Sequence, residues 1–157
     1  MFISLACLLI FSSCSDSVRF FPEDKDNTAN LDFYTRFTSS GTSAEVDQSG
    51  LKSGTWIYTQ QNGSGTATYL GNFTFTMNCL FCCSGSECGK FENGSGCFIS
   101  RDTGDKLYIS FTGKAKMLDS NDESGYAGIL EDPFQVTGGT GLFKNATGQG
   151  VLKSCFT

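Results

Sequence analysis

The chain contains no histidine among its 157 residues, so any chemistry must rest on other side chains. Without histidine there is no usual general base near neutral pH, no Ser–His or Cys–His nucleophile pair, and little basis for a catalytic zinc site. Carboxylates, Tyr, Lys, Arg and backbone amides remain. Glu45 stands beside Ala44 and Val46 in a β-prone run, where burial would raise its pKa and make it a candidate acid. The alternative is that Glu45 faces water.

Cysteine is the other reactive residue type, with eight copies in the chain. Six of them follow the N-terminal segment: Cys79, Cys82, Cys83, Cys88, Cys97 and Cys155. An even number in an exported domain predicts three disulfides, and the adjacent Cys82 and Cys83 are expected to take different partners. The alternative is a metal cluster on the CLFCC run. An oxidising compartment and the lack of histidine favour disulfides, so we expect no metal and no cofactor.

The first residues of the chain predict export. Residues 1–15 hold the apolar run FISLACLLIF followed by small residues, which is too short for a permanent membrane-spanning helix and suits a secretion signal. Two endings fit this segment. In the first, Phe11–Cys14 resembles a bacterial lipobox, and Cys14 would be lipidated on an outer-membrane lipoprotein. In the second, ordinary signal-peptide cleavage occurs before Asp16. Either ending predicts a secreted or extracellular protein, with a membrane attachment only if Cys14 carries a lipid.

Four Asn-x-Ser/Thr sequons favour a secreted glycoprotein over a bacterial lipoprotein. Their asparagines are Asn62, Asn72, Asn93 and Asn145. The net charge is −5, and no cluster of Lys and Arg occurs in the chain. This balance argues against a nucleic-acid partner.

Residues 16–30 are charged, contain Pro22 and lack periodicity, so we expect a flexible leader. From residue 31 to 157, short β-rich runs alternate with turn residues, which predicts one all-β domain. The runs are Leu31–Thr38, Ser43–Asp47, Gly54–Gln60, Gly65–Met77, Cys97–Arg101, Lys106–Met117, Tyr126–Glu131, Phe134–Thr137 and Gly148–Phe156. Eight or nine strands in a domain of this size predict a closed eight-stranded antiparallel up-and-down barrel, in which closure removes exposed strand edges.

Two features of the predicted barrel concern its connections. Asn62-Gly63 and Asn93-Gly94 are dipeptides that favour tight hairpin turns. The segment Asn78–Gly96 is rich in cysteine and is expected to be a disulfide-rich loop insertion at one mouth of the barrel.

Glycines are dense near the end of the chain, in Phe134–Cys155, which reads FQVTGGTGLFKNATGQGVLKSC. Glycines within β-prone sequence mark tight turns and bends. Together with LDFYTRFTSSGTSAEV, GTATYLGNFTFT and GDKLYISFTGKAKM, this stretch resembles the allene oxide cyclase and dirigent-protein barrel superfamily. The resemblance covers residues 31–156 apart from the cysteine-rich segment. It implies an eight-stranded barrel with an apolar central cavity, often trimeric.

The chain departs from the dirigent pattern where chemistry would occur. Dirigent proteins carry a His-Asp pair on the first strand, and the corresponding positions here are Arg36 and Phe37. We therefore expect a secreted, non-catalytic dirigent-like barrel that binds a small apolar or aromatic ligand or serves as an extracellular structural subunit. The alternative is an isomerase or cyclase acting on a lipid-derived or phenolic substrate. The expected ligand-binding residues are Phe33, Phe37, Phe73, Phe75 and Phe111.

Overall fold

The described part of the chain is almost entirely β-strand. The computed structural model describes residues 9–12, 16–19, 32–46, 55–83, 89–118 and 124–156, and side chains from residue 34 to 44 in the first long strand. The elements are β1 (Leu9–Ser12), β2 (Asp16–Arg19), β3 (Asp32–Val46), β4 (Trp56–Ala67), β5 (Gly71–Cys82), β6 (Lys90–Ser100), β7 (Lys106–Met117), β8 (Gly128–Gly139), the 3₁₀ turn η1 (Gly141–Phe143) and β9 (Gly148–Phe156).

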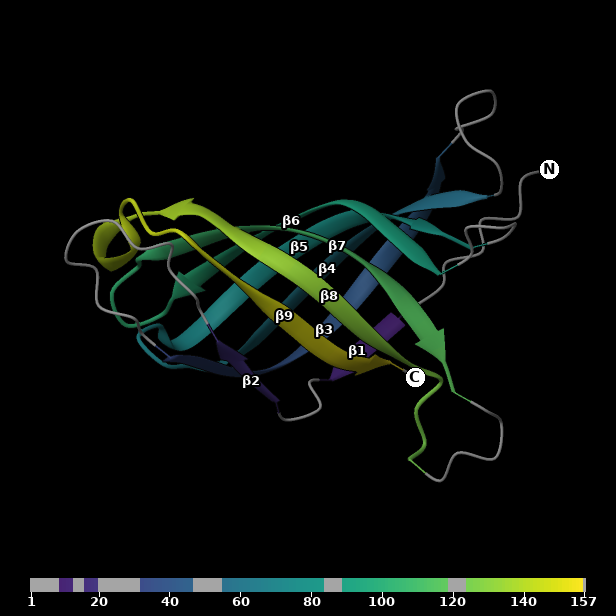
Figure 1. Ribbon diagram of the computed structural model, residues 1–157, viewed down its shortest axis with the longest axis horizontal. Helices are drawn as coiled ribbons and strands as arrows, with labels where there is room; N and C mark the ends of the chain where they lie inside the picture. The colour runs from purple at the N-terminus through teal and green to yellow at the C-terminus, as the bar shows by residue number, and fades with distance from the viewer. Residues whose placement is uncertain are drawn as a thin grey trace.

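Seven long strands, β3 to β9, run up and down in chain order and form one antiparallel sheet that curls into a half-barrel (Figure 1). This confirms the predicted all-β, antiparallel, up-and-down architecture. The predicted closed barrel of eight strands is not shown. Within the described residues, β3 and β9 have no pairing with each other. The predicted strand count was too high because two pairs of short runs merge, one pair into β3 and the other into β8.

The short strand β1 lies between the two outer strands of the half-barrel. Leu9–Ser12 pairs with Thr38–Gly41 of β3, and two of its residues also pair with Cys155 and Phe156 of β9. β2 pairs with Asp32–Thr35 at the start of β3. Parts of the predicted signal and leader therefore lie in strands, while the division into signal, leader and barrel domain stays a prediction.

Both Asn-Gly pairs lie inside strands, so the prediction that they form hairpin turns is wrong. Gly63 is in the middle of β4, where a Cβ would come within 2.6 Å of ring carbons of Phe75. Asn93 has a φ of 53° and lies at a break in the β6–β7 register, between the pairs that involve Phe91 and Gly94. In β6 the left-handed residue makes a β-bulge, and in β4 the glycine makes room for an aromatic ring.

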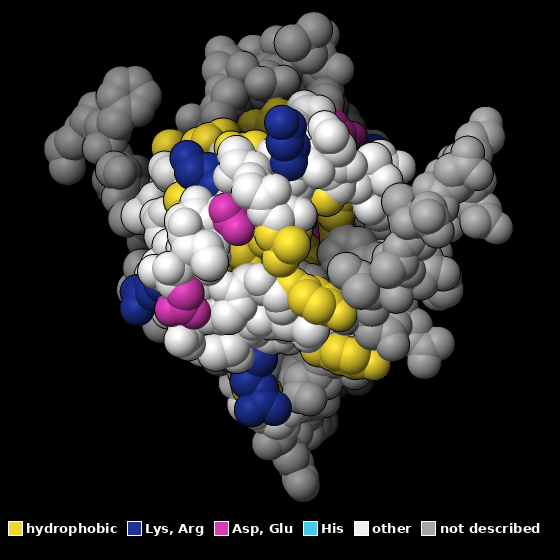
Figure 2. All heavy atoms as spheres, turned by 90° about the vertical axis from the view of Figure 1, so that its left-hand side faces the viewer, with side chains coloured by type: hydrophobic (Ala, Val, Ile, Leu, Met, Phe, Trp, Pro, Cys, Tyr) yellow, Lys and Arg dark blue, Asp and Glu magenta, His cyan; other side chains and the backbone are white. Residues whose placement is uncertain are grey.

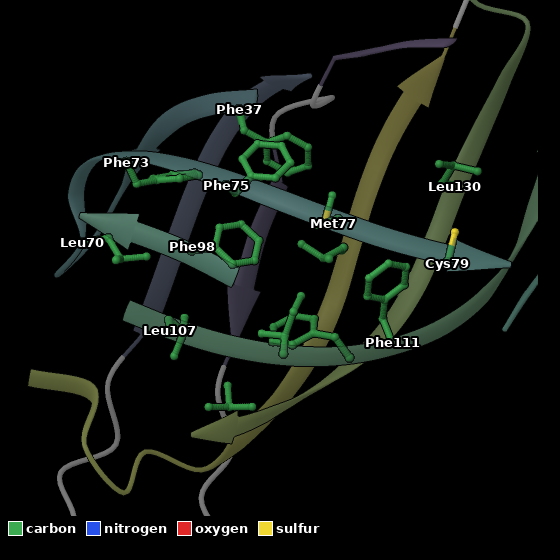
Figure 3. Packing of buried hydrophobic residues seen from close by; sticks show 14 of the residues in the cluster. Phe37, Leu70, Phe73, Phe75, Met77, Cys79, Phe98, Leu107, Phe111 and Leu130 are labelled. Atoms are coloured by element: carbon green, nitrogen blue, oxygen red, sulfur yellow. The ribbon is translucent and has the colours of Figure 1, made fainter. Parts of the chain in front are cut away.

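The apolar core covers the inner face of the sheet (Figure 3). In β5, alternate residues Phe73, Phe75 and Met77 are buried and the residues between them are partly exposed, because successive side chains of a strand point to opposite faces. The ring centroid of Phe75 lies 5.2 Å from that of Phe37 and 5.3 Å from that of Phe98. These distances are typical of packed aromatic pairs, so the rings fill this part of the interior.

The end of the molecule that carries η1 is apolar. Figure 2 looks onto this end and shows hydrophobic side chains gathered near its centre. Leu70 and Phe143 are buried there, whereas Tyr69 and Leu142 are exposed. The aromatic core therefore extends to this end of the half-barrel.

The cysteine-rich segment is not a separate loop insertion, which corrects the prediction. Residues up to Cys82 continue β5 and residues from Lys90 belong to β6. Four cysteines are not in disulfides: Cys79, Cys82, Cys83 and Cys97. Cys155 is disulfide-bonded, to none of these four. Cys88 and the lipidation candidate Cys14 lie outside the described residues.

The predicted set of three disulfides is therefore not shown, and strand geometry explains why Cys79 and Cys97 are not bonded to each other. Cys79 is buried on the inner face of β5, whereas Cys97 of β6 is only half-buried and pairs in register with Thr76, a residue of the outer face. Side chains on opposite faces of a sheet cannot meet in a disulfide without moving the backbone.

Candidate functional site

Polar and ionisable side chains are also buried in the mostly apolar interior, and six of them are called the interior polar group. This interior polar group consists of Ser39, Thr59, Gln61, Cys79, Asp132 and Ser154. The residues come from β3, β4, β5, β8 and β9. Each occupies an inward position of its strand, in phase with buried neighbours two residues away. The half-barrel thus combines an aromatic region with a polar region on the same inner face.

Asp132 is the acidic member of the interior polar group. It lies in β8 between the buried residues Leu130 and Phe134, with Val136 next in the same phase. Because these positions share one face of the strand, the carboxyl enters the core rather than the solvent. Its neighbours in sequence, Glu131 and Pro133, are exposed on the other face.

The backbone and a glycine make room for the Asp132 carboxyl. The β7–β8 ladder has no paired residues at Asp132 and Pro133, and proline has no N–H to donate there. Gly113 of β7 lies beside this gap, and a Cβ on it would overlap Oδ1 of Asp132. A side chain at residue 113 would therefore occupy the space of the carboxyl.

The Asp132 carboxyl is buried without full hydrogen bonding. Its Oδ1 is buried and has no hydrogen-bond partner within the described part of the chain. Burial raises the pKa of Asp132 from 3.8 to about 7, because the ionised form loses its hydration. Among the lysines and arginines whose side chains are described, none is buried. A buried, poorly satisfied carboxyl with a pKa near neutrality is typical of functional sites.

Cys79 and Thr59, two other members of the interior polar group, approach each other. The Oγ1 of Thr59 lies 3.0 Å from the Sγ of Cys79, and the same hydroxyl donates to the Cys79 carbonyl at 3.4 Å. Burial raises the pKa of Cys79 to about 11, the charge of Asp132 raises it further, and the Thr59 hydrogen bond opposes both. The thiol is therefore protonated at neutral pH and is a poor nucleophile. β5 and β8 therefore each place a buried ionisable side chain on the inner face of the half-barrel.

Two further members of the interior polar group also interact with each other. The Oγ of Ser39 donates to Oε1 of Gln61 at 3.4 Å. This long hydrogen bond links β3 to β4. Hydroxyl and amide groups of this kind can donate to or accept from a bound molecule.

Four of the five predicted ligand-binding phenylalanines belong to the core. Phe37, Phe73, Phe75 and Phe111 are buried, and the first three are in ring contact with one another or with Phe98. The side chain of the fifth, Phe33, lies outside what the structure describes. The described rings therefore form the aromatic wall of the interior.

The predicted acid and the residue found in the core are different. Glu45 lies in β3 and pairs in register with Ile57, and its side chain lies outside what the structure describes. Asp132 was not singled out from the sequence, because it lies between two predicted runs, Tyr126–Glu131 and Phe134–Thr137. Asp132 could have been identified from the alternating pattern, because Leu130, Asp132 and Phe134 are spaced by two residues and therefore share one face of a strand that includes Pro133.

Side chains of the first long strand, β3, alternate between the buried and the exposed face, as expected for a strand. Phe37 is buried, and Tyr34 and Arg36 are exposed. The asparagines of all four sequons, Asn62, Asn72, Asn93 and Asn145, are exposed as well. Their exposure is compatible with glycans, which stay a prediction.

Within the described ranges, no three His, Cys, Asp or Glu side chains are grouped so that they could hold a metal ion. In the same part of the chain, no helix has the length and apolar character needed to cross a bilayer.

The chain was compared with protein-family models, with curated proteins and with solved structures. None of them matches it. Membership of the dirigent-like superfamily therefore stays a prediction from the sequence motifs.

Proposed function

We propose that this protein is a secreted, non-catalytic, dirigent-like β-barrel that binds a small apolar or aromatic ligand in its interior. The observation that carries the proposal is the buried Oδ1 of Asp132, which lacks a hydrogen-bond partner among the described residues. Leaving a buried polar atom unsatisfied costs about 1–3 kcal/mol, and more for a charged group. A ligand that offers one polar group to Asp132 and an apolar body to the aromatic wall would remove this cost.

The finer features of the proposed protein are those predicted from its sequence. We propose that the sheet closes into an eight-stranded barrel, and the pairing of β1 with both β3 and β9 supports this. Export, a disulfide at Cys155, glycans at the exposed sequon asparagines and a trimeric assembly complete the proposal. A structural or surface role for the barrel would need no ligand at all.

Binding can be tested with N-phenyl-1-naphthylamine, an uncharged dye that fluoresces in apolar surroundings. We expect the secreted full chain to bind the dye, and Gln61→Phe to weaken binding, because residue 61 is buried in the interior. The matched control is Gln60→Phe, one residue away on the exposed face. Circular dichroism shows whether both variants keep their β-structure. No binding by the folded wild type, or equal binding by both variants, would contradict the proposal.

A second function is favoured by one specific observation, the pKa of about 7 at Asp132. A carboxyl with this pKa can give and take a proton near neutral pH, which an isomerase or cyclase requires. The test compares the small molecules extracted from wild type and from Asp132→Asn produced in the same host. An enzyme would yield two different isomers, whereas a binding protein would yield one compound in reduced amount.

A further inference from the structure

The surroundings of Asp132 also indicate the chemical class of the ligand. We propose that the interior binds a small aromatic amine, whose ammonium group pairs with the Asp132 carboxylate. This inference rests on the proposed ligand-binding function and adds the charge and type of the ligand's polar group.

The first argument is that no lysine or arginine with a described side chain is buried beside the carboxyl. Leu152, which pairs with Asp132 in β9, is apolar, and the interior thiol of Cys79, with its partner Thr59, is uncharged at neutral pH. Gly113 contributes no side chain from β7. A buried carboxylate is stable only when a cation and hydrogen bonds compensate it. Among the described residues, none supplies that cation.

The second argument is that the neighbouring charges are directed away from the interior. Glu131 precedes Asp132, and its carboxylate lies 3.6 Å from the ammonium of Lys153 on β9. The side chains of Glu131 and Lys153 are 65% and 44% exposed. This ion pair therefore lies on the outer face of the sheet, and its lysine does not compensate the inner carboxylate.

The third argument concerns the shape and sign of the ligand. Phe111, Phe134 and Leu130 are buried around the same region of β7 and β8, so the site offers apolar and aromatic contacts next to one negative charge. An ammonium group has three donors for the carboxylate, and an aromatic body packs well on phenylalanine. A fatty acid would place a second carboxylate against Asp132 and be repelled. The net charge of −5 also attracts cations to the protein.

Three indoles of nearly equal size separate charge from shape in a direct test. Tryptamine carries an ammonium group, tryptophol carries a hydroxyl at the same position, and 3-ethylindole carries neither. Each is titrated at pH 8 into the full secreted chain by calorimetry, using wild type, Asp132→Asn and Glu131→Gln. The last variant removes a carboxylate from the outer face and is the matched control.

We expect wild type to bind tryptamine about 10- to 100-fold more tightly than 3-ethylindole, the range given by one charge-assisted pair. Asp132→Asn should lose this preference and retain its affinity for 3-ethylindole, and Glu131→Gln should behave as wild type. If 3-ethylindole binds but tryptamine binds no more tightly, the inference is wrong while the proposed function stands. Equal binding of tryptophol and tryptamine, or a preference that survives in Asp132→Asn, would also overturn it. If folded wild type binds none of the three, both the inference and the interior binding site are rejected.

Discussion

Gly113 and Asp132 share one space between neighbouring strands: a Cβ on residue 113 would overlap the carboxyl oxygen Oδ1 of Asp132. The glycine is in β7 and the acid is in β8, at the point where the ladder between these strands has no paired residues. The carboxyl is therefore accommodated by a missing side chain on one strand and by Pro133 on the other. This arrangement makes the position of Asp132 sensitive to the smallest substitution at residue 113.

Gly113→Ala should displace the Asp132 carboxyl and lower the free energy of unfolding by about 1–3 kcal/mol, the usual cost of overpacking a core. Urea unfolding followed by circular dichroism measures this change. Thr112→Ala, on the exposed face of the same strand, is the control and should change stability by less than about 0.5 kcal/mol. In an Asp132→Ala background, Gly113→Ala should cost less, because the overlapping group is gone. An equal cost in both backgrounds would mean that the two residues do not share space.

Asp132→Asn should change how stability depends on pH. The pKa of Asp132 is about 7 in the folded state and 3.8 for the ordinary side chain, so the folded state binds more protons between these values. The stability of wild type relative to the variant is then highest below pH 4 and falls as the pH rises toward 7. The full difference amounts to roughly 4 kcal/mol by proton linkage.

The measurement for Asp132→Asn is urea unfolding at several pH values, with wild type compared to the variant at each one. Glu131→Gln, whose side chain is exposed, is the control and should not change this pH dependence. A wild type that gains stability relative to Asp132→Asn as the pH rises would mean that the carboxylate is compensated in the folded state.

Much of the strand order was predictable from the sequence, because alternation and turn residues act locally. The predicted bounds of Lys106–Met117 and Gly148–Phe156 are those of β7 and β9. Two separate runs were predicted on either side of Asp132 and Pro133, yet β8 continues through both residues, which are unpaired with β7. Asp132 was missed for the same reason. Its side chain is recognised as inward-pointing only when residues 128–139 are treated as one continuous strand.

The two Asn-Gly pairs show where local patterns fail. Gly63 and Gly94 each lie against an aromatic ring from a neighbouring strand, Phe75 and Phe111 respectively. These contacts join residues that are far apart in the chain, so they cannot be predicted from the turn propensity of a dipeptide. The predicted disulfides are similarly not shown for Cys79 and Cys97, because the face on which each cysteine lies depends on the strand register.

Phe75→Ala should lower the free energy of unfolding by about 3–5 kcal/mol, the usual cost of truncating a buried aromatic ring. Phe75 is buried and in ring contact with Phe37, Phe73 and Phe98, so its removal leaves a cavity in the aromatic core. Leu142→Ala is the control, because Leu142 is 66% exposed and should contribute little. Thermal unfolding of both variants provides the comparison. A loss below about 1 kcal/mol for Phe75→Ala would indicate a loosely packed interior.

The thiols of Cys79 and Cys97 should react with alkylating reagents before any reductant is added, because neither is in a disulfide. Cys97 is half-buried and should react in the folded protein, whereas burial and a pKa of about 11 should protect Cys79 until the chain unfolds. Iodoacetamide is applied to the native protein and N-ethylmaleimide after unfolding in urea, and peptide mass spectrometry identifies each label. Cys155 is disulfide-bonded and serves as the internal control, which takes up label only after reduction. The contradicting outcome is that Cys79 and Cys97 also stay unlabelled until reduction. The exported protein would then have the disulfides that the cysteine count predicts. The interior around Cys79 would also differ from the one described.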